Sequence, residues 1–278
     1  MARSRNRGAK RRSPVVNGIF YPENPETIRG MFDSWGLKEG SPARGGQAIL
    51  VPHGAWGLTG SIAAAAFAAV QKEAGQSIST VLILGKYHQP AEEGIYLSES
   101  ASFETPLGDL QVDRKLNREL ASCSTQIRIN DIPHLSEHSL EVLLPMVKYC
   151  FPEAAIVPIL MSGERQALIS GLAKALRVIL EKYREESLFI VSSNVSKNPD
   201  SGLALSMADE FRSLLESMDT RAFFDCLSAG RISACGGPLI GALLESGLLE
   251  GRRFSALLPP AQYRGENGDT FYNGAFGT

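Results

Sequence analysis

The sequence predicts a single layered α/β domain with a mostly parallel central sheet flanked by helices. Strand-like and helix-like patterns alternate along almost the whole chain, as they do in sheets whose strands are joined through helices. The short runs 48–52 and 80–85 are almost entirely apolar, which is typical of parallel strands buried on both faces. With 278 residues, of which 44% are hydrophobic, the chain can form one large core.

The individual elements follow from local patterns. Residues 25–35 are expected to form a helix with proline in its first turn, where the missing amide donor is tolerated. The apolar, alanine-rich segment 58–72 and the helical spacing of apolar residues in 164–183 predict helices packed on the sheet. Further helices are expected at 113–122, 139–149, 203–215, 220–227 and 237–246. Strands are expected at 48–51, 81–84, 94–97, 155–160, 188–191, 254–258 and 270–276.

The beginning of the chain differs in composition from the rest. Residues 1–13 contain six basic residues and no acidic one, although the net charge of the whole chain is only −2. We therefore expect a disordered basic arm over 1–13 and one domain over 14–278, because neither a repeat nor a low-complexity linker divides the remainder. Such an arm could contact nucleic acid or an anionic membrane. Without basic patches interleaved with aromatic residues, however, we expect no nucleic-acid partner.

Several classes of protein are disfavoured by what the sequence lacks. No run approaches the roughly 18 apolar residues of a transmembrane helix, and the basic arm is not followed by the apolar segment of a secretory signal. The four cysteines show no C-x-x-C spacing, so reduced thiols in the cytoplasm are expected, with no membrane association. There is no G-x-G-x-x-G, Walker loop or G-x-S-x-G element, so nucleotide binding and serine hydrolysis lack their signatures.

Three residues that are good transition-metal ligands stand where strands end or helices begin. His53 and His88 follow the two apolar strands, and Cys235 precedes the helix at 237–246 within a glycine-rich loop. In layered α/β proteins, ligands collect at the carboxyl ends of the strands. A histidine bonded only to a neighbouring carbonyl is the alternative for each position alone. Together they predict a shared metal site, with donor atoms within about 5 Å of one another because each metal–ligand bond is roughly 2.0–2.3 Å.

A second group of residues lies in the segment 136–141, Ser-Glu-His-Ser-Leu-Glu. Ser136 could cap the following helix, with acidic residues in its first turn. Alternatively, Glu137 and His138 face the same cleft as the metal site and support the metal ligands or move protons. His134 is expected on a polar loop without a role. The segment 192–196 is expected to supply polar groups at the end of its strand.

Seven blocks in this order resemble the Memo family, called AmmeMemoRadiSam system protein B in bacteria and archaea. The blocks are Asn-Gly-Ile-Phe-Tyr-Pro (17–22), Val-Pro-His-Gly-Ala-Trp (51–56), Leu-Gly-Lys-Tyr-His (84–88), Thr-Pro-Leu-Gly-Asp (105–109), Glu-His-Ser-Leu-Glu with Leu-Pro (137–141 and 144–145), Val-Ser-Ser-Asn (191–194) and Cys-Gly-Gly-Pro-Leu-Ile-Gly (235–241). The resemblance implies a fold similar to the class III extradiol dioxygenases, which use non-haem iron. It also implies that His53, His88 and Cys235 are the metal ligands.

The metal implied by the resemblance is a divalent transition ion, with Fe(II) expected first and copper or zinc as alternatives. A thiolate in place of the carboxylate of the dioxygenases softens the site, which favours copper as well as iron. The resemblance further implies radical-SAM and AMMECR-type proteins as partners, and a small-molecule or peptide ligand in the pocket.

The chain departs from the family pattern at the end of the strand 188–191. Where the family reads S-S-D-x-x-H, this chain has Asn194 and Lys197. A lysine can act as an acid or base near neutral pH only if burial lowers its pKa considerably. Two functions stay open. Glu137, His138, Asn194 and Lys197 form the catalytic shell of a dioxygenase-like metalloenzyme acting on a small aromatic or related substrate, or the protein is an accessory member of the AmmeMemoRadiSam system. The altered shell favours the accessory role.

Overall fold

In the computed structural model, residues 10–40, 47–71, 78–89, 92–265 and 267–278 are described. Four parallel strands form the centre of the main sheet, in the spatial order β2 (Gln47–Val51), β9 (Ser187–Ser192), β3 (Thr80–Lys86) and β8 (Ala155–Ser162). Antiparallel pairings begin at both flanks of this centre. Beyond β8 lie β4 (Gly94–Leu97) and β7 (Ile127–Ile129), and beyond β2 lie β12 (Thr270–Gly277), β10 (Ser196–Asn198) and β11 (Ser255–Arg264).

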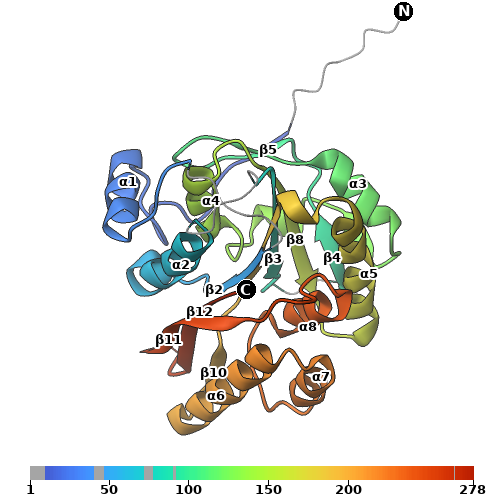
Figure 1. Ribbon diagram of the computed structural model, residues 1–278. Coiled ribbons are helices and arrows are strands. Elements are labelled where there is room, and N and C mark those ends of the chain that lie inside the picture. Colours follow the sequence, from blue (N-terminus) through green and yellow to red (C-terminus); the bar gives the residue numbers. More distant parts are fainter. Residues whose placement is uncertain (1–9, 41–46, 72–77, 90–91, 266) are drawn as a thin grey trace, which may run out of the picture.

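Helices cover both faces of this sheet (Figure 1). One face carries α3 (Arg114–Ser122), α5 (Gln166–Lys182), α6 (Ser201–Ser217), α7 (Thr220–Ser228) and α8 (Gly237–Ser246). The other face carries α1 (Pro25–Ser34), α2 (Trp56–Val70) and α4 (Leu144–Cys150). Short 3₁₀ turns occur at Pro133–Leu135, Glu141–Leu143 and Arg184–Glu186. The predicted layered α/β architecture is confirmed.

The central strands supply both hydrophobic cores because successive side chains point to opposite faces. In β2, Ala48 and Leu50 belong to the core under α5 and α8, whereas Ile49 and Val51 belong to the core under α1 and α2. This two-sided burial explains why the strands read as continuous apolar runs. The strand β11 is an exposed flank of the sheet. It extends past the predicted end at residue 258, through two prolines that a sheet interior would not accept.

The register of the central strands determines where the loops after them meet. Val51 of β2 and Gly85 of β3 both lie opposite Ser192 of β9. Three parallel strands therefore end at the same level. The residues that follow them emerge side by side at one edge of the sheet, which is the position expected for a ligand site.

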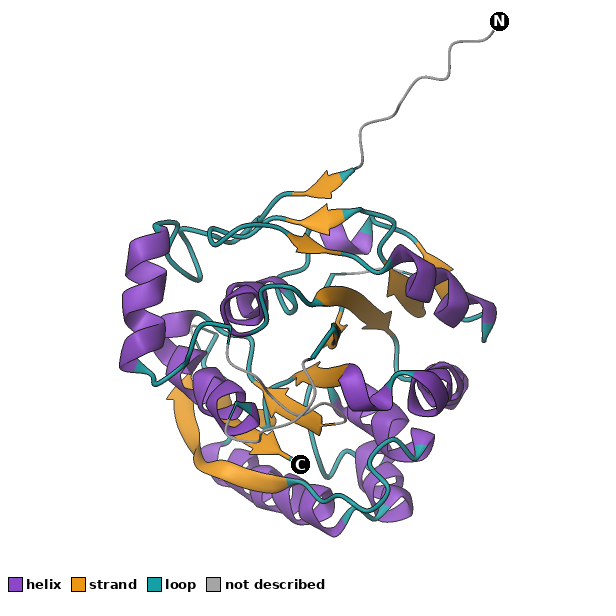
Figure 2. Ribbon diagram, turned by 45° about the horizontal axis from the view of Figure 1, so that its top comes forward, coloured by secondary structure: helices purple, strands orange, loops and turns teal. Residues whose placement is uncertain are grey.

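The start of the described chain is part of the folded domain. Arg11–Arg12 form β1, which pairs with β5 (Ser102–Phe103), and β5 pairs with β6 (Leu110–Gln111). This small sheet lies apart from the main one (Figure 2). The predicted disordered arm of residues 1–13 therefore does not reach residue 13. Residues 1–9 of that arm lie outside the described residues.

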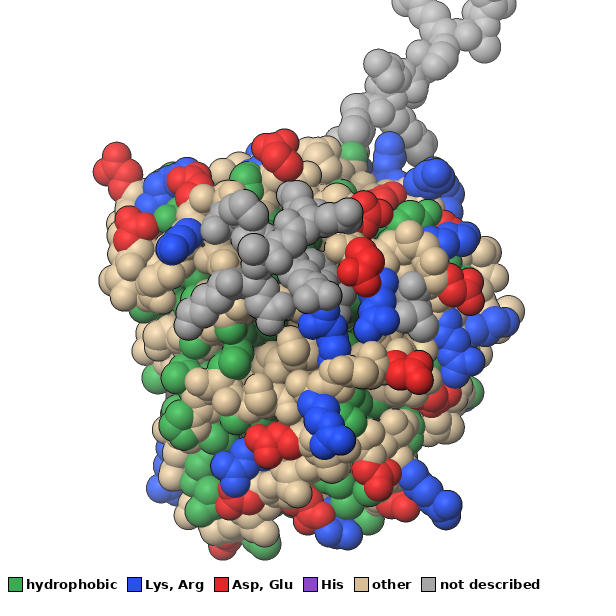
Figure 3. Space-filling model, in the orientation of Figure 1, with side chains coloured by type: hydrophobic (Ala, Val, Ile, Leu, Met, Phe, Trp, Pro, Cys, Tyr) green, Lys and Arg blue, Asp and Glu red, His purple; other side chains and the backbone are tan. Residues whose placement is uncertain are grey.

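The described surface shows no large-scale charge separation on the side drawn in Figure 3, where acidic and basic side chains are interspersed. Among the described residues, no helix is long and apolar enough to cross a membrane.

Candidate metal centre and substrate cavity

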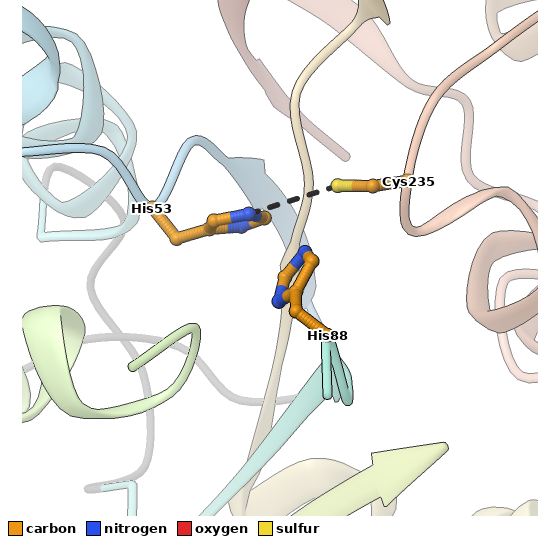
Figure 4. Close-up of side chains that lie close together, drawn as sticks. All are labelled: His53, His88 and Cys235. Atoms are coloured by element: carbon orange, nitrogen blue, oxygen red, sulfur yellow. Dashed lines mark hydrogen bonds between the residues drawn. The ribbon is translucent and has the colours of Figure 1, made fainter. Parts of the chain in front are cut away.

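His53, His88 and Cys235 come together at the edge of the sheet. His53 lies two residues after β2, His88 two residues after β3, and Cys235 two residues before α8. One potential ligand atom from each residue lies within 4.8 Å of the other two. The Sγ atom of Cys235 is 3.7 Å from Nε2 of His53, and the two imidazole rings face the same space (Figure 4). The structure thus brings the three side chains together as predicted, although their positions are spread over most of the chain.

The orientation of His53 is fixed by a chain of two hydrogen bonds. The hydroxyl of Ser192 donates to the carbonyl of Ser139 over 2.6 Å, so its oxygen must accept from Nδ1 of His53 at 2.9 Å. In the neutral ring this places the proton on Nδ1 and leaves a lone pair on Nε2, the atom nearest Cys235. The sequence predicted polar groups at the end of β9, but it did not predict that Ser192 would orient His53.

His88 is held by a buried carboxylate. Glu137 is 3% exposed and accepts two hydrogen bonds from His88, one from its backbone N–H at 2.7 Å and one from ring atom Nδ1 at 2.9 Å. A third bond comes from the backbone N–H of Ser139 at 2.8 Å. Since Nδ1 is engaged with Glu137, the remaining ring nitrogen of His88 is the one available to a metal. Carboxylate support of this kind is usual for metal-binding histidines.

Two neighbouring histidines differ in acid–base behaviour. Burial lowers the pKa of His88, but hydrogen bonds with Cys235 and Glu137 and the charges of both outweigh it and raise the pKa to about 9. Burial raises the pKa of Glu137, but its contacts with His88 and Ser139 lower it to about 2. His138 lies with its ring centroid 5.2 Å from that of His88, and burial lowers its pKa to about 4.

Glu137 and His138 could form a second ligand group with His88. The carboxylate oxygens of Glu137 are already occupied by three donors, two of them backbone N–H groups. The group of His53, His88 and Cys235 is therefore the better candidate for a metal ion. Glu137 instead holds the ring of His88 in place through its hydrogen bond to Nδ1.

Cys235 is positioned by the residues after β9. Its backbone N–H donates to Oδ1 of Asn194 at 2.8 Å, and the next amide, of Gly236, donates to the hydroxyl of Ser193 at 2.8 Å. A Cβ atom on Gly236 would lie only 2.7 Å from Cβ of Ser193, so this close approach requires glycine. Asn194 thus acts through the backbone of Cys235.

The electrostatic surroundings of Cys235 favour a thiolate. Burial raises the pKa of the thiol, but the positive charge that His53 has when its ring is doubly protonated, and hydrogen bonds with His53, His88 and Ser193, bring it well below the ordinary value. A thiolate is the form that binds metals. Two imidazole nitrogens and one thiolate form a donor set suited to Fe(II), copper or zinc.

The loop before α4 differs from its predicted form. Ser136 caps no helix, because the 3₁₀ turn begins only at Glu141 and its preceding residue makes no side-chain cap. The capping interpretation of this segment is wrong. The prediction that His134 lies on a polar loop is also wrong, since His134 is only 2% exposed. Its ring is enclosed beside Phe103, with centroids 5.9 Å apart.

Arg12 anchors this loop from the small sheet. Its guanidinium forms a buried ion pair with Glu141 and donates to the carbonyls of His134 at 2.9 Å and Glu137 at 3.0 Å. Glu141 also accepts from the backbone N–H of Val16 at 2.8 Å. These long-range contacts had no local signal in the sequence.

A cavity of about 740 Å³ opens beside the three candidate ligand residues. His138 and Asn194 line it as predicted, and Lys197 lies on its wall with a side chain 46% exposed. Glu137 does not line it, because His88 and His138 stand in front. Sequence reasoning missed the cavity residues Tyr263, Phe271 and Asn273, which only the pairing of β11 with β12 identifies.

Comparison with known proteins places the chain among relatives. Residues 12–258 match the model of the family described as Memo-like protein. A MEMO1 family protein of Thermoplasma volcanium is 26% identical, over 88% of this chain and 89% of that protein. Another, of Desulfurococcus amylolyticus, is 28% identical, over 85% and 87% respectively. The crystal structure of an uncharacterized protein from Escherichia coli K12 superposes with a TM-score of 0.52 at 12% identity, covering 83% of this chain and 98% of that one, which shows a shared fold.

Proposed function

The chain belongs to the Memo-like family, and we propose that it binds one divalent transition metal ion between His53, His88 and Cys235 and acts on a small ligand held in the adjoining cavity. The observation that carries this proposal is the common orientation of the three donors. Both histidines have Nδ1 engaged with the protein, and three ligand atoms lie within 4.8 Å of one another. Three protein ligands would leave coordination positions for a ligand.

The donor set supports Fe(II) as the first choice, with copper or zinc as alternatives. A metal ion bound here would supply Lewis-acid or one-electron redox chemistry. The protein residues would hold the ligand and move protons. His138 lines the cavity, and its Nδ1 lies 3.3 Å from the ionised Glu137, which leaves the Nε2 lone pair to accept a proton from a ligand. This arrangement supports a dioxygenase-like metal-dependent oxidoreductase.

A second candidate function is an accessory role in the AmmeMemoRadiSam system, with radical-SAM and AMMECR-type proteins as partners. The contacts of the two altered residues favour it. Asn194 is engaged with the backbone of Cys235, and Lys197 is paired with Asp269 at 2.9 Å. Neither is therefore free for the acid–base work expected of a catalytic shell at these positions.

Metal titration tests the shared core of both functions. Calorimetry with Fe(II) or Zn(II) under anaerobic, reducing conditions should give one ion per chain. Cys235→Ser should weaken binding by at least tenfold, because the thiolate contributes charge as well as a donor. Cys123→Ser is the matched control, since Cys123 lies on α3's C-terminal cap and outside the candidate site. Equal affinity for wild type and Cys235→Ser would contradict the proposal.

Turnover and association then separate the two functions. Stoichiometric iron with oxygen uptake on catechol-like substrates would support the oxidoreductase. Co-purification with a radical-SAM or AMMECR-type protein, without oxygen uptake, would support the accessory role.

A further inference from the structure

One wall of the cavity is built from the strands β10, β11 and β12, and four of its side chains share a face. Lys197 and Tyr263 both lie opposite Phe271 in the antiparallel register, and Asn273 follows Phe271 by two residues. Residues that pair directly, or that are two apart on one strand, point to the same side of a sheet. All four line the cavity. We define Lys197, Tyr263, Phe271 and Asn273 as the hairpin face.

Asn273 is a buried polar side chain on the cavity wall. The residue is 4% exposed, and within the described residues its amide makes no hydrogen bond although it lines the cavity. An amide can donate two hydrogen bonds and accept two. Its free hydrogen-bonding capacity is available only to what enters the cavity.

Lys197 places a positive charge on the same face. Its ammonium lies 2.9 Å from Oδ2 of Asp269 and 5.3 Å from the centre of the Phe271 ring. A lysine ammonium has three donors, so the contact with Asp269 fixes its position and leaves two N–H groups for a ligand. Lys197 lines the cavity and Asp269 does not, so a ligand in the cavity would face the positive charge of Lys197.

Two aromatic rings complete the face. The rings of Tyr263 and Phe271 stack with an interplanar angle of 10° and centroids 5.0 Å apart. Both residues are half-buried and line the cavity. A stacked pair of this kind offers an apolar aromatic surface against which a ring can pack in an offset or edge-to-face arrangement.

We propose that the hairpin face is a recognition subsite for a carboxylate attached to a planar ring. The carboxylate would accept hydrogen bonds from the ammonium of Lys197 and from the amide N–H of Asn273, and the ring would pack against Tyr263 and Phe271. The inference deepens the proposed function, on which it rests, because it names the class of ligand held beside the metal ligands. Lys197 and Asn273 are specificity-determining residues in this assignment.

Benzoate and benzamide test the subsite, since they have nearly the same shape and differ in charge. Their binding to the full chain, metal-free and zinc-loaded, can be followed by NMR titration. Wild type should bind benzoate about tenfold or more tightly than benzamide, because hydrogen bonds to charged groups are the stronger ones. Lys197→Gln should reduce this ratio to about threefold or less. Asn273→Asp should reverse it, because the new carboxylate repels benzoate and accepts from the benzamide N–H groups.

Lys86→Gln is the matched control. Lys86 is the other lysine of the cavity and is paired with Glu164 at 2.7 Å, but it ends β3, four strands from β10. This places the two lysines' strands roughly 19 Å apart across the sheet. The control should keep the preference of wild type for benzoate.

The outcomes separate the subsite from the metal site. Absence of a preference for benzoate in wild type, or its loss in Lys86→Gln but not in Lys197→Gln, would overturn the assignment. Zinc affinity is measured in the same samples. A protein that prefers benzoate through Lys197 without binding zinc would keep the subsite and contradict the proposed function. A protein that binds zinc but shows no preference for benzoate would keep the proposed metal site and contradict the subsite.

Discussion

Glu137 and Glu141 are two carboxylates of one loop, four residues apart and both almost completely buried, at 3% and 1% exposure. Glu137 accepts from His88 and faces the candidate metal ligands. Glu141 faces the interior and pairs with Arg12. The first orders a site and the second anchors the start of the described chain. Burial and residue type are therefore not enough to predict the role of an acidic residue. The role depends on the partner, which is His88 for Glu137 and Arg12 for Glu141.

The largest effect is expected on the interior side. Glu141→Gln leaves the guanidinium of Arg12, whose side chain is 2% exposed, without its counter-charge. Removing one partner of a buried ion pair typically lowers the free energy of unfolding by roughly 3–5 kcal/mol. Urea unfolding should show this loss. Glu39→Gln is the control, because Glu39 pairs with Arg29 at the surface, where a pair contributes at most about 1 kcal/mol; an equal loss in both variants would contradict the comparison.

A pH effect is expected from the same interior side. Burial lowers the pKa of His134 to about 4, whereas an unfolded chain takes up this proton near 6.5. The folded state therefore loses stability as the pH falls from about 6.5 toward 4, by roughly 3 kcal/mol from this residue. Chemical unfolding at pH 7 and pH 4.5 should show a smaller difference for His134→Gln than for wild type. An unchanged difference would mean that the pKa of His134 is the same in the folded and the unfolded protein.

On the side of the cavity, Glu137→Gln should affect metal binding more than stability. The amide keeps an acceptor for His88 but loses the charge that supports it, and loss of such a partner typically weakens metal binding 10- to 100-fold. Calorimetric titration with Zn(II) measures this. Glu164→Gln, which changes an exposed acid of the cavity, should leave the affinity within about twofold. If Glu137→Gln binds zinc with the affinity of wild type, Glu137 does not support the metal site, and the contrast with Glu141 fails.

The smallest effect is expected from restoring the family pattern with Asn194→Asp and Lys197→His. An aspartate can accept the same bond from the backbone of Cys235, and its charge should tighten metal binding by a few-fold. Lys197 is held by Asp269 on the far wall, so the gain should come from Asn194→Asp alone. Titration of both single variants and the double variant separates the two positions. An equal or weaker affinity in all three would show that neither is coupled to the metal ligands.

The convergence of the three candidate ligand residues could be predicted because strand ends and helix starts are visible in the local pattern. His53 and His88 each follow an apolar run, and Cys235 precedes a recognisable helix. The support of these residues depends on contacts between distant segments, as in the bonds from His53 to Ser192 and from His88 to Glu137.

The role of Asn273, the burial of Arg12 and the form of the loop at Ser136 could not be predicted from the sequence, because they too depend on contacts between distant segments. Asn273 sits in an ordinary strand pattern, and its place in the cavity follows from the register of β11, β12 and β10. Arg12 looked like one more charge of a disordered arm, and its burial follows from an acid 129 positions away. A local capping signal at Ser136 was outweighed by the bonds that Glu137 makes to His88.

Cobalt(II) absorption tests the central claim most directly, because it reports on sulfur coordination as well as binding. The account predicts one Co(II) per chain with a near-ultraviolet thiolate-to-metal charge-transfer band, lost in Cys235→Ser and kept in Cys123→Ser. Co(II) bound without that band, or a band that persists in Cys235→Ser, would contradict a metal site formed by His53, His88 and Cys235.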